Sequence, residues 1–228
     1  MIRKCDVTER TPISEYPRPG VAFLVMNSAA SSLVLGDLVV TTHTRSQRIA
    51  RDAVLVSLAV LFTAASAQVS IPLGFTPVPL TLQTFAVLLT GAALGMRRGA
   101  LGMGLYWVAG LVGLPFYQGG KGGWSEGTGA TMGYLVGFIV AAAVIGMLAE
   151  RRHDRNFATS LPAMVMGSAI IYAFGASWLA MHLNIGLAVG DPNAIELGVA
   201  PFLVGDALKA LAAAACTSTV WATLRHRG

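Results

Sequence analysis

Long apolar runs separated by short polar stretches dominate the chain from Ile49 onward. The six runs lie at residues 53–69, 80–95, 99–114, 132–149, 161–183 and 202–224. A perpendicular crossing of a bilayer needs about 20 apolar residues, so several runs are close to that length and others, such as 80–95, fall short of it. The pattern predicts an all-α integral membrane protein with six transmembrane helices. The short runs require loops that fold back into the protein, or neighbours that cover the short helices.

Composition supports the membrane class and argues against a nucleic-acid-binding protein. Only 12% of the residues are charged, whereas soluble domains average about 25%. The net charge of +5 does not indicate nucleic-acid binding, because the arginines form short clusters between apolar runs and not a continuous basic stripe. Such clusters are better explained as signals of membrane topology.

Basic residues gather at alternate connections between the runs. They are Arg45, Arg48, Arg51, Arg97, Arg98, Arg151, Arg152, Arg155, Arg225 and Arg227. The three opposite loops, 70–79, 115–131 and 184–201, contain no Arg and a single Lys, Lys121. The positive-inside rule then predicts that both termini are cytoplasmic. The external loops are rich in Gly, Pro and aromatic residues, and we expect the binding face there.

Residues 1–44 differ from the rest of the chain. The polar, proline-containing start predicts a disordered or weakly ordered N-terminal extension, followed by a six-helix membrane domain over 45–228. Residues 21–40 make a poor spanning segment. They fit either a weak amphipathic helix or an over-long gene start with Met26 as the true initiator. No apolar core ends at a small-residue cleavage site, so we do not expect a signal peptide.

Asp206 and Lys209 are the charged pair that most needs an explanation. They lie three residues apart within the last apolar run, which places them on one helix face about one turn apart. A charge at the membrane centre costs on the order of 2.5–3.5 kcal/mol on insertion scales. A carboxylate only accepts hydrogen bonds and an ammonium only donates them, so the pair suits a neutral ligand that carries both N–H and C=O groups. The alternative is a purely structural ion pair.

The first external loop, Ser70 to Thr84, is apolar and contains three prolines that prevent a continuous helix. Its apolar side chains, Phe75 among them, suit a lid that folds over a binding site. A loop packed on helix ends for shape alone is the alternative. Gln83 has the groups to bond a ligand amide, and a polar contact between helices explains it equally well.

The second external loop, 113–131, combines glycines with aromatic residues. Gly119, Gly120 and their neighbours allow close approach of the backbone to a ligand, and Trp124 offers a flat apolar face. The Gly-Gly-Lys-Gly-Gly run around Lys121 lacks the G-x-x-x-x-G-K-[ST] pattern of a phosphate loop. The chain therefore carries no ATPase motif of its own, and active transport would need partner subunits or an ion gradient.

Other polar and aromatic residues give weaker indications. Tyr172 and Trp178 are candidates for the site wall, although ordinary core aromatics explain them as well. His182 and Asn184 fit interfacial polar residues best. No Ser/His/Asp, Cys/His or paired-carboxylate constellation occurs, and of the acidic residues we expect only Asp206 to lie deep. The sequence predicts no enzyme, no cofactor and no metal site.

Seven segments in order resemble the BioY family, the biotin-binding S-components of energy-coupling factor (ECF) transporters. The segments are 71–84, 94–99, 113–115, 119–123, 133–134, 172–175 and 201–209. The resemblance covers about residues 50–224, and it implies a six-helix S-component fold with biotin near the external side. It also implies a coupling membrane subunit and ABC-type ATPase subunits as partners, although some members are reported to work without them.

The family's Asp-x-x-Lys falls on Asp206 and Lys209. The resemblance implies that Asp206 accepts hydrogen bonds from the N–H groups of the biotin ureido ring, while Lys209 donates to its carbonyl. It also carries a ligand-binding role to Gly119–Gly123 and to Tyr134. The family's entry to the fourth helix reads differently here, as Gly-Ala-Thr-Met-Gly-Tyr, so Thr131 is a candidate on weaker grounds.

The predicted function is that of a biotin-binding subunit in the cell membrane. It would capture biotin on the extracellular side and deliver it to the cytoplasm with an ECF coupling subunit and ATPases. The alternatives are a stand-alone secondary biotin carrier and an S-component for another vitamin.

Overall fold

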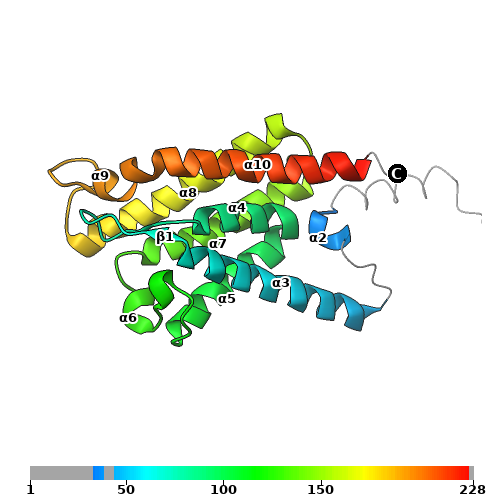
Figure 1. Ribbon diagram of the computed structural model, residues 1–228, viewed down its shortest axis with the longest axis horizontal. Helices are drawn as coiled ribbons and strands as arrows, with labels where there is room; N and C mark the ends of the chain where they lie inside the picture. Colours follow the sequence, from blue (N-terminus) through cyan, green and yellow to red (C-terminus); the bar gives the residue numbers. More distant parts are fainter. Residues whose placement is uncertain (1–32, 39–43, 226–228) are drawn as a thin grey trace, which may run out of the picture.

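The structure, a computed structural model, describes residues 33–38 and 44–225, and helices account for most of them (Figure 1). The elements in chain order are α2 (Leu35–Leu38), α3 (Arg45–Gln68), β1 (Ser70–Ile71), β2 (Leu80–Thr81), α4 (Gln83–Leu94), α5 (Met96–Leu111), the 3₁₀ turn η1 (Gln118–Gly120), α6 (Trp124–Gly127), α7 (Met132–Glu150), α8 (Phe157–Leu183), α9 (Ala194–Gly198), the 3₁₀ turn η2 (Ala200–Phe202) and α10 (Leu203–Arg225).

Each of the six predicted apolar runs is a helix, namely α3, α4, α5, α7, α8 and α10. Four helical segments of the described chain are long and apolar enough to cross a membrane: Arg45–Gln68, Met132–Glu150, Phe157–Leu183 and Ala194–Arg225. Gln83–Leu94 is apolar but shorter. The all-α membrane class is thus confirmed, while the number of crossings remains a prediction.

The long helices run roughly along one axis and give the bundle two distinct ends (Figure 1). The start of α3 and the end of α10 lie at one end, beside α2; we call this the α2 end. The β1–β2 hairpin, α6 and α9 lie at the other, which we call the hairpin end. The common location of the two helix ends agrees with termini on one side of the membrane, and that this side is cytoplasmic remains a prediction.

Helix α7 packs against α4, α5 and α8 at close range because small residues line the contacts. A Cβ on Gly91 of α4 would lie 2.9 Å from the Ala142 carbonyl oxygen of α7. A Cβ on Gly137 would lie 3.0 Å from Cα of Ile171 in α8. Larger side chains at these positions would push the helices apart.

The first of the predicted external loops folds back on the bundle through a short hairpin. β1 and β2 pair antiparallel, with Ser70 opposite Thr81. Between the strands, the Thr76 hydroxyl donates a 2.7 Å hydrogen bond to the Leu197 carbonyl oxygen of α9. Val78 is 6% exposed, so the loop contributes to the core and covers the helix ends beneath it. This arrangement is what a lid requires.

Part of the N-terminal extension packs on the α2 end. Val34 is 1% exposed and joins a core cluster with Leu88 and Ile145. Asp37 forms ion pairs with Arg98 at 2.7 Å and with Arg51 at 3.3 Å. The expectation of weak order for residues 1–32 and 39–43, including Met26, lies outside the described residues.

The expectation that Asp206 alone among the acidic residues lies deep is wrong. Asp154, in the connection between α7 and α8, is 3% exposed, compared with 5% for Asp206. Trp221 of α10 donates a hydrogen bond from Nε1 to its carboxylate, and the Arg155 guanidinium stacks on the Trp221 ring at 3.6 Å from the centroid. A residue distant in the chain therefore covers Asp154.

Candidate functional site

A cavity of about 140 Å³ opens at the hairpin end of the bundle. Its wall is formed by the second half of the first loop, α4, α5, the second loop (113–131), α7, α8, η2 and the start of α10. Its lining residues include Pro77, Thr81, Gln83, Thr84, Tyr106, Tyr117, Gln118, Lys121, Glu126, Thr131, Tyr134, Phe138, Tyr172, Phe202, Asp206 and Lys209.

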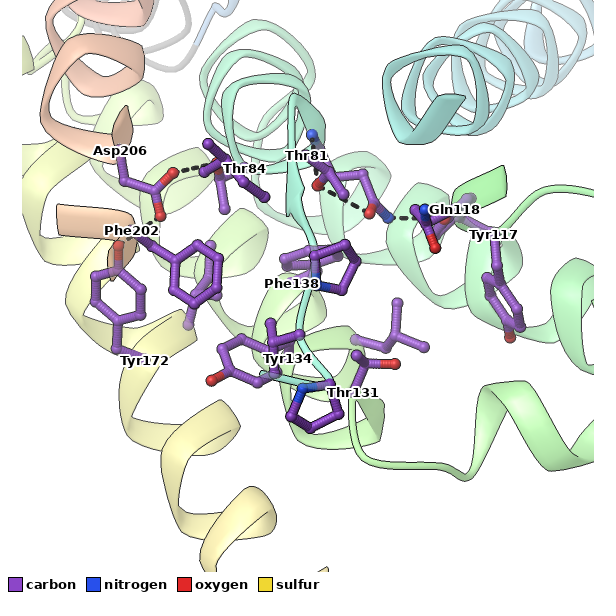
Figure 2. A pocket seen from close by; sticks show the side chains of 18 of the residues that line it. Thr81, Thr84, Tyr117, Gln118, Thr131, Tyr134, Phe138, Tyr172, Phe202 and Asp206 are labelled. Carbon is purple, nitrogen blue, oxygen red and sulfur yellow. Dashed lines mark hydrogen bonds between the residues drawn. The ribbon is translucent and has the colours of Figure 1, made fainter. Parts of the chain in front are cut away.

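Asp206 and Lys209 form the charged part of the wall. Lys209 Nζ lies 2.7 Å from Oδ1 of Asp206, and it also donates to the Thr81 carbonyl oxygen of β2 at 2.6 Å. The Thr84 hydroxyl donates to the same Asp206 oxygen at 2.9 Å, and the Tyr172 hydroxyl donates to Oδ2 at 2.5 Å (Figure 2). Asp206 lies in the first turn of α10, where the helix dipole favours a negative charge.

The network leaves both charged groups with hydrogen-bonding capacity. A carboxylate has about four acceptor positions, and Asp206 receives three hydrogen bonds from the described residues. An ammonium has about three protons, and Lys209 donates two of them to described acceptors. One acceptor position on Asp206 and one donor on Lys209 thus remain for a ligand that offers N–H and C=O groups.

A second polar chain crosses the cavity wall between α4 and α5. Gln83 Nε2 donates to the Tyr106 hydroxyl at 2.7 Å, and the Thr81 hydroxyl donates to Gln83 Oε1 at 3.0 Å. The Tyr106 hydroxyl in turn donates to the Phe116 carbonyl oxygen at 3.2 Å. Gln83 therefore makes an interhelical contact and lines the cavity as well, so the two interpretations of its role are compatible.

Aromatic and apolar side chains form the middle of the cavity wall. The Tyr134 hydroxyl donates to the Gly198 carbonyl oxygen at 2.7 Å, which holds its ring beside Phe138, Thr131 and Phe202 (Figure 2). Burial raises the pKa of Tyr117, in the second loop, to about 12, so its hydroxyl stays neutral near pH 7. The wall offers flat, uncharged surfaces to the body of a ligand.

The structure brings together most of the predicted site residues. Those that line the cavity are Asp206, Lys209, Gln83, Lys121, Thr131, Tyr134 and Tyr172. Gly119, Gly120, Phe75 and Trp124 are not among the lining residues, and the last two are 63% and 72% exposed. Trp178 also lies outside, with its Nε1 donating to the Gly129 carbonyl oxygen at 2.9 Å. The ligand contacts of all these residues remain predictions.

Gly119 and Gly120 act on the site through the backbone. Their φ angles of 69° and 72° lie in the left-handed region that favours glycine. The turn that they form stands between Gln118 and Lys121, both of which reach the cavity. Its Gly120 amide donates to Gln68 Oε1 at 2.9 Å, which ties the second loop to α3.

Sequence reasoning missed Thr81, Thr84 and Tyr106. All three bond the charged or amide side chains of the site. The run Thr-Leu-Gln-Thr from Thr81 to Thr84 places three polar side chains next to an apolar helix. That cluster was the available signal for the two threonines, whereas no local pattern indicated Tyr106.

These features define a helical membrane protein with a cavity at one end of its bundle whose lining suits a small molecule. The model of the BioY family matches residues 31–226, and the chain belongs to this family. The match begins earlier than the segments that carry the resemblance, so it includes α2.

Relatives and a solved structure agree with the family. The probable biotin transporter BioY of Pyrococcus horikoshii is 39% identical over 164 residues, covering 72% of this chain and 92% of the relative. The biotin transporter BioY of Thermotoga maritima is 42% identical over 157 residues, covering 68% and 88%. The crystal structure of the S-component for biotin from an ECF-type ABC transporter superposes with a TM-score of 0.69 at 26% identity, covering 82% and 96%. The fold is therefore that of an S-component, and the relatives are transporters, not enzymes.

Proposed function

We propose that this chain is the biotin-binding S-component of an ECF-type importer in the cytoplasmic membrane. It captures biotin from outside at the hairpin end. A transmembrane coupling subunit and ABC-type ATPase subunits then drive delivery to the cytoplasm. The relatives and the solved structure are named for biotin, which supports biotin as the ligand of this chain. The sequence contains no ATPase motif, which supports a need for partner subunits.

The observation that carries the proposal is the spare acceptor and donor of the Asp206–Lys209 pair within the cavity. The biotin ureido ring presents N–H donors and a C=O acceptor on one edge. A site built around such groups rejects analogues that leave its polar side chains unpaired. The apolar bicyclic body of biotin suits the wall around Tyr134 and Phe138.

The cavity must enlarge when biotin enters. Its volume of about 140 Å³ is below the roughly 300–1,000 Å³ of pockets for drug-sized ligands. The first loop is attached to the rest of the site by few polar contacts, such as those of Thr76 and Thr81. Displacement of this loop, which supplies Pro77 and Val78 to the wall, would enlarge the cavity, in keeping with a lid.

Calorimetric titration of the purified protein in detergent tests the proposal. Biotin should bind saturably, and biotin with the ureido oxygen replaced by an imino group should bind at least tenfold more weakly. Equal affinity for the two ligands would remove Asp206 and Lys209 from ligand recognition. No heat with biotin would reject biotin as the ligand.

Uptake of labelled biotin by a host that lacks its own biotin transport tests the partners. The chain alone should support little uptake, and the chain with a coupling subunit and ATPases should support much more. Equal uptake with and without the partner subunits would instead identify a stand-alone carrier.

A further inference from the structure

Gln68, the last residue of α3, joins the end of this helix to the turn of the second loop. Its Nε2 donates a 3.1 Å hydrogen bond to the Tyr117 carbonyl oxygen, and its Oε1 accepts a 2.9 Å hydrogen bond from the Gly120 amide. Nε2 also donates to the Ala64 carbonyl oxygen at 3.1 Å, which fixes the side chain against its own helix. One side-chain amide thus offers the loop a C=O and an N–H group, as a neighbouring strand would.

The turn that Gln68 holds has little rigidity of its own. Gly119 and Gly120 adopt positive φ angles, and glycine loses more conformational freedom on folding than any other residue. Contacts from outside the turn must therefore offset this entropy cost. A second such contact comes from the same place in the chain, because Gln118 Nε2 donates to the Ser70 hydroxyl of β1 at 3.2 Å.

The junction of α3 and β1 also holds the first loop. Ser70 pairs with Thr81 in the β1–β2 hairpin, and the Leu82 amide donates to the Val69 carbonyl oxygen at 3.1 Å. The Thr81 carbonyl oxygen in turn accepts the hydrogen bond from Lys209. Residues 68–70 are therefore a common attachment point for both loops that cover the cavity.

The second loop contributes a wall of the cavity that faces the buried ion pair. Tyr117 and Gln118 line the cavity, and in Figure 2 they stand on the side opposite Asp206. Gln68 itself is not among the lining residues. Its influence on a bound ligand must therefore pass through the position of this wall.

We propose that Gln68 is a positioning residue of the binding site, which holds the second loop against the first so that the two form one cover over the cavity. The inference rests on the proposed function, in which biotin is the ligand beneath this cover. A bound ligand leaves only when the cover opens, whereas the empty site also samples open arrangements. Loss of the Gln68 contacts should therefore speed release more than it changes the rate of entry.

Gln68→Met tests the role, because methionine keeps the length of the side chain and removes its hydrogen-bonding groups. Release and binding of labelled biotin are followed in the full-length protein in detergent. The dissociation rate constant should rise about three- to tenfold, and the association rate constant should stay within about twofold. Gln68 is exposed, so we expect the variant to fold with a thermal midpoint within about 2 °C of the original. An unchanged dissociation rate would overturn the proposal, whatever happens to the midpoint.

Thr128→Val is the matched control in the same loop. The Thr128 hydroxyl bonds the Trp124 carbonyl oxygen at 2.8 Å, and this contact reaches neither α3 nor the cavity lining. Release of biotin from this variant should be unchanged. Equal acceleration in both variants would show general loosening of the loop, and the specific role of Gln68 would be disproved.

Hydrogen exchange of the ligand-free protein tests the contact without biotin. Amides in residues 117–121 should exchange about fivefold faster or more in Gln68→Met, because Gly120 loses its acceptor. Unchanged exchange there would overturn the proposal. Failure of the proposed function is distinct, since the unaltered protein would then bind no biotin while the difference in exchange would persist.

Discussion

Acidic and basic side chains pair at both ends of the helix bundle, and the two sets differ in their surroundings. At the α2 end, Asp37 bonds Arg98 and Arg51, and Asp52 bonds the same two arginines at 3.4 Å and 3.0 Å. At the hairpin end, Asp206 bonds Lys209. Of these residues, only Asp206 and Lys209 line the main cavity.

The α2-end pairs join three segments of the chain. Asp37 precedes the bundle, Arg51 belongs to α3 and Arg98 to α5. Each guanidinium contacts both carboxylates, so the four charges satisfy one another. Such a cluster works as a clamp between segments.

The Asp206–Lys209 pair at the hairpin end makes most of its other hydrogen bonds with uncharged groups, unlike the cluster at the α2 end. Lys209 donates one hydrogen bond to the Thr81 carbonyl oxygen, and the hydroxyls of Thr84 and Tyr172 donate two of the hydrogen bonds to Asp206. The comparison teaches that burial of a charge pair alone does not identify a binding site. Burial together with an adjoining cavity and spare hydrogen-bonding positions does.

The largest expected effect is on ligand affinity, and it should follow a substitution at the hairpin end but not one at the α2 end. Asp206→Ala removes the hydrogen-bond acceptor and leaves the Lys209 ammonium buried without its carboxylate. Loss of one partner of a buried ion pair lowers the free energy of unfolding by about 3–5 kcal/mol. We expect biotin affinity to fall at least 100-fold in calorimetric titration. Asp37→Ala, which removes a partly buried acid at the α2 end, should leave the affinity within about twofold of the original.

A double variant separates binding from stability at this pair. Asp206→Ala with Lys209→Met removes both charges, so the thermal unfolding midpoint should recover relative to Asp206→Ala alone. Biotin binding should remain lost. Recovery of binding in the double variant would contradict a direct role of the pair in recognition.

Asp37→Ala should have the next largest effect, on stability. It leaves Arg98 and Arg51 with Asp52 alone and releases the segment that carries Val34. Because the Asp37 side chain is 17% exposed, we expect a cost of about 2 kcal/mol, below that of a fully buried pair. The measurement is the thermal midpoint in detergent, followed by tryptophan fluorescence. An unchanged midpoint would show that the cluster is no clamp.

Tyr172→Phe sharpens the description of the hairpin end, with a smaller effect on affinity than Asp206→Ala. It removes the only described hydrogen bond to Oδ2 of Asp206 and keeps the aromatic ring in the wall. A hydrogen bond to a charged group contributes about 1.5–3 kcal/mol, so we expect biotin affinity to fall about tenfold or more. Tyr117→Phe, which removes a hydroxyl bonded to the Trp107 carbonyl oxygen, is the matched control, with at most a small change expected. Equal losses in both variants would point to general loosening of the cavity.

The helices and the central ion pair were predictable because both depend on local sequence. Apolar run length predicted the six helical segments, and a spacing of three residues brought Asp206 and Lys209 onto one face. The partners of Asp206 were not predictable in the same way. Thr84 and Tyr172 lie 122 and 34 positions away along the chain, and only the packing of α4, α8 and α10 brings them together.

Two loop residues that were predicted to belong to the site do not line the cavity. Phe75 and Trp124 have the right chemistry and the right loops, yet most of each side chain faces away from protein contacts. Sequence specifies which residues a loop carries, but the direction of each side chain depends on turns and tertiary contacts. The burial of Asp154 was missed for a related reason, because the residue that covers it, Trp221, lies 67 positions away along the chain.

The smallest expected effect concerns Asp154 and its dependence on pH. Burial raises the pKa of the Asp154 carboxyl, and this outweighs the hydrogen bond from Trp221 and the charge of Arg155, which lower it. The folded protein therefore holds this proton more tightly than the unfolded chain does. The resulting stabilisation is complete below the unfolded pKa of about 3.9 and disappears as pH rises through the raised folded-state pKa.

Asp154→Asn tests that sign. The amide keeps an acceptor for Trp221 and removes the titration, so the midpoint difference between variant and original protein should increase as pH rises from about 4 to about 8. We expect a relative gain of a few degrees at the upper end, measured by thermal unfolding in one detergent across the series. Biotin affinity should not change, because Asp154 is not a cavity residue. A constant midpoint difference across this range would show that Asp154 does not titrate there, and its burial would then serve only to anchor Trp221 and the end of α10.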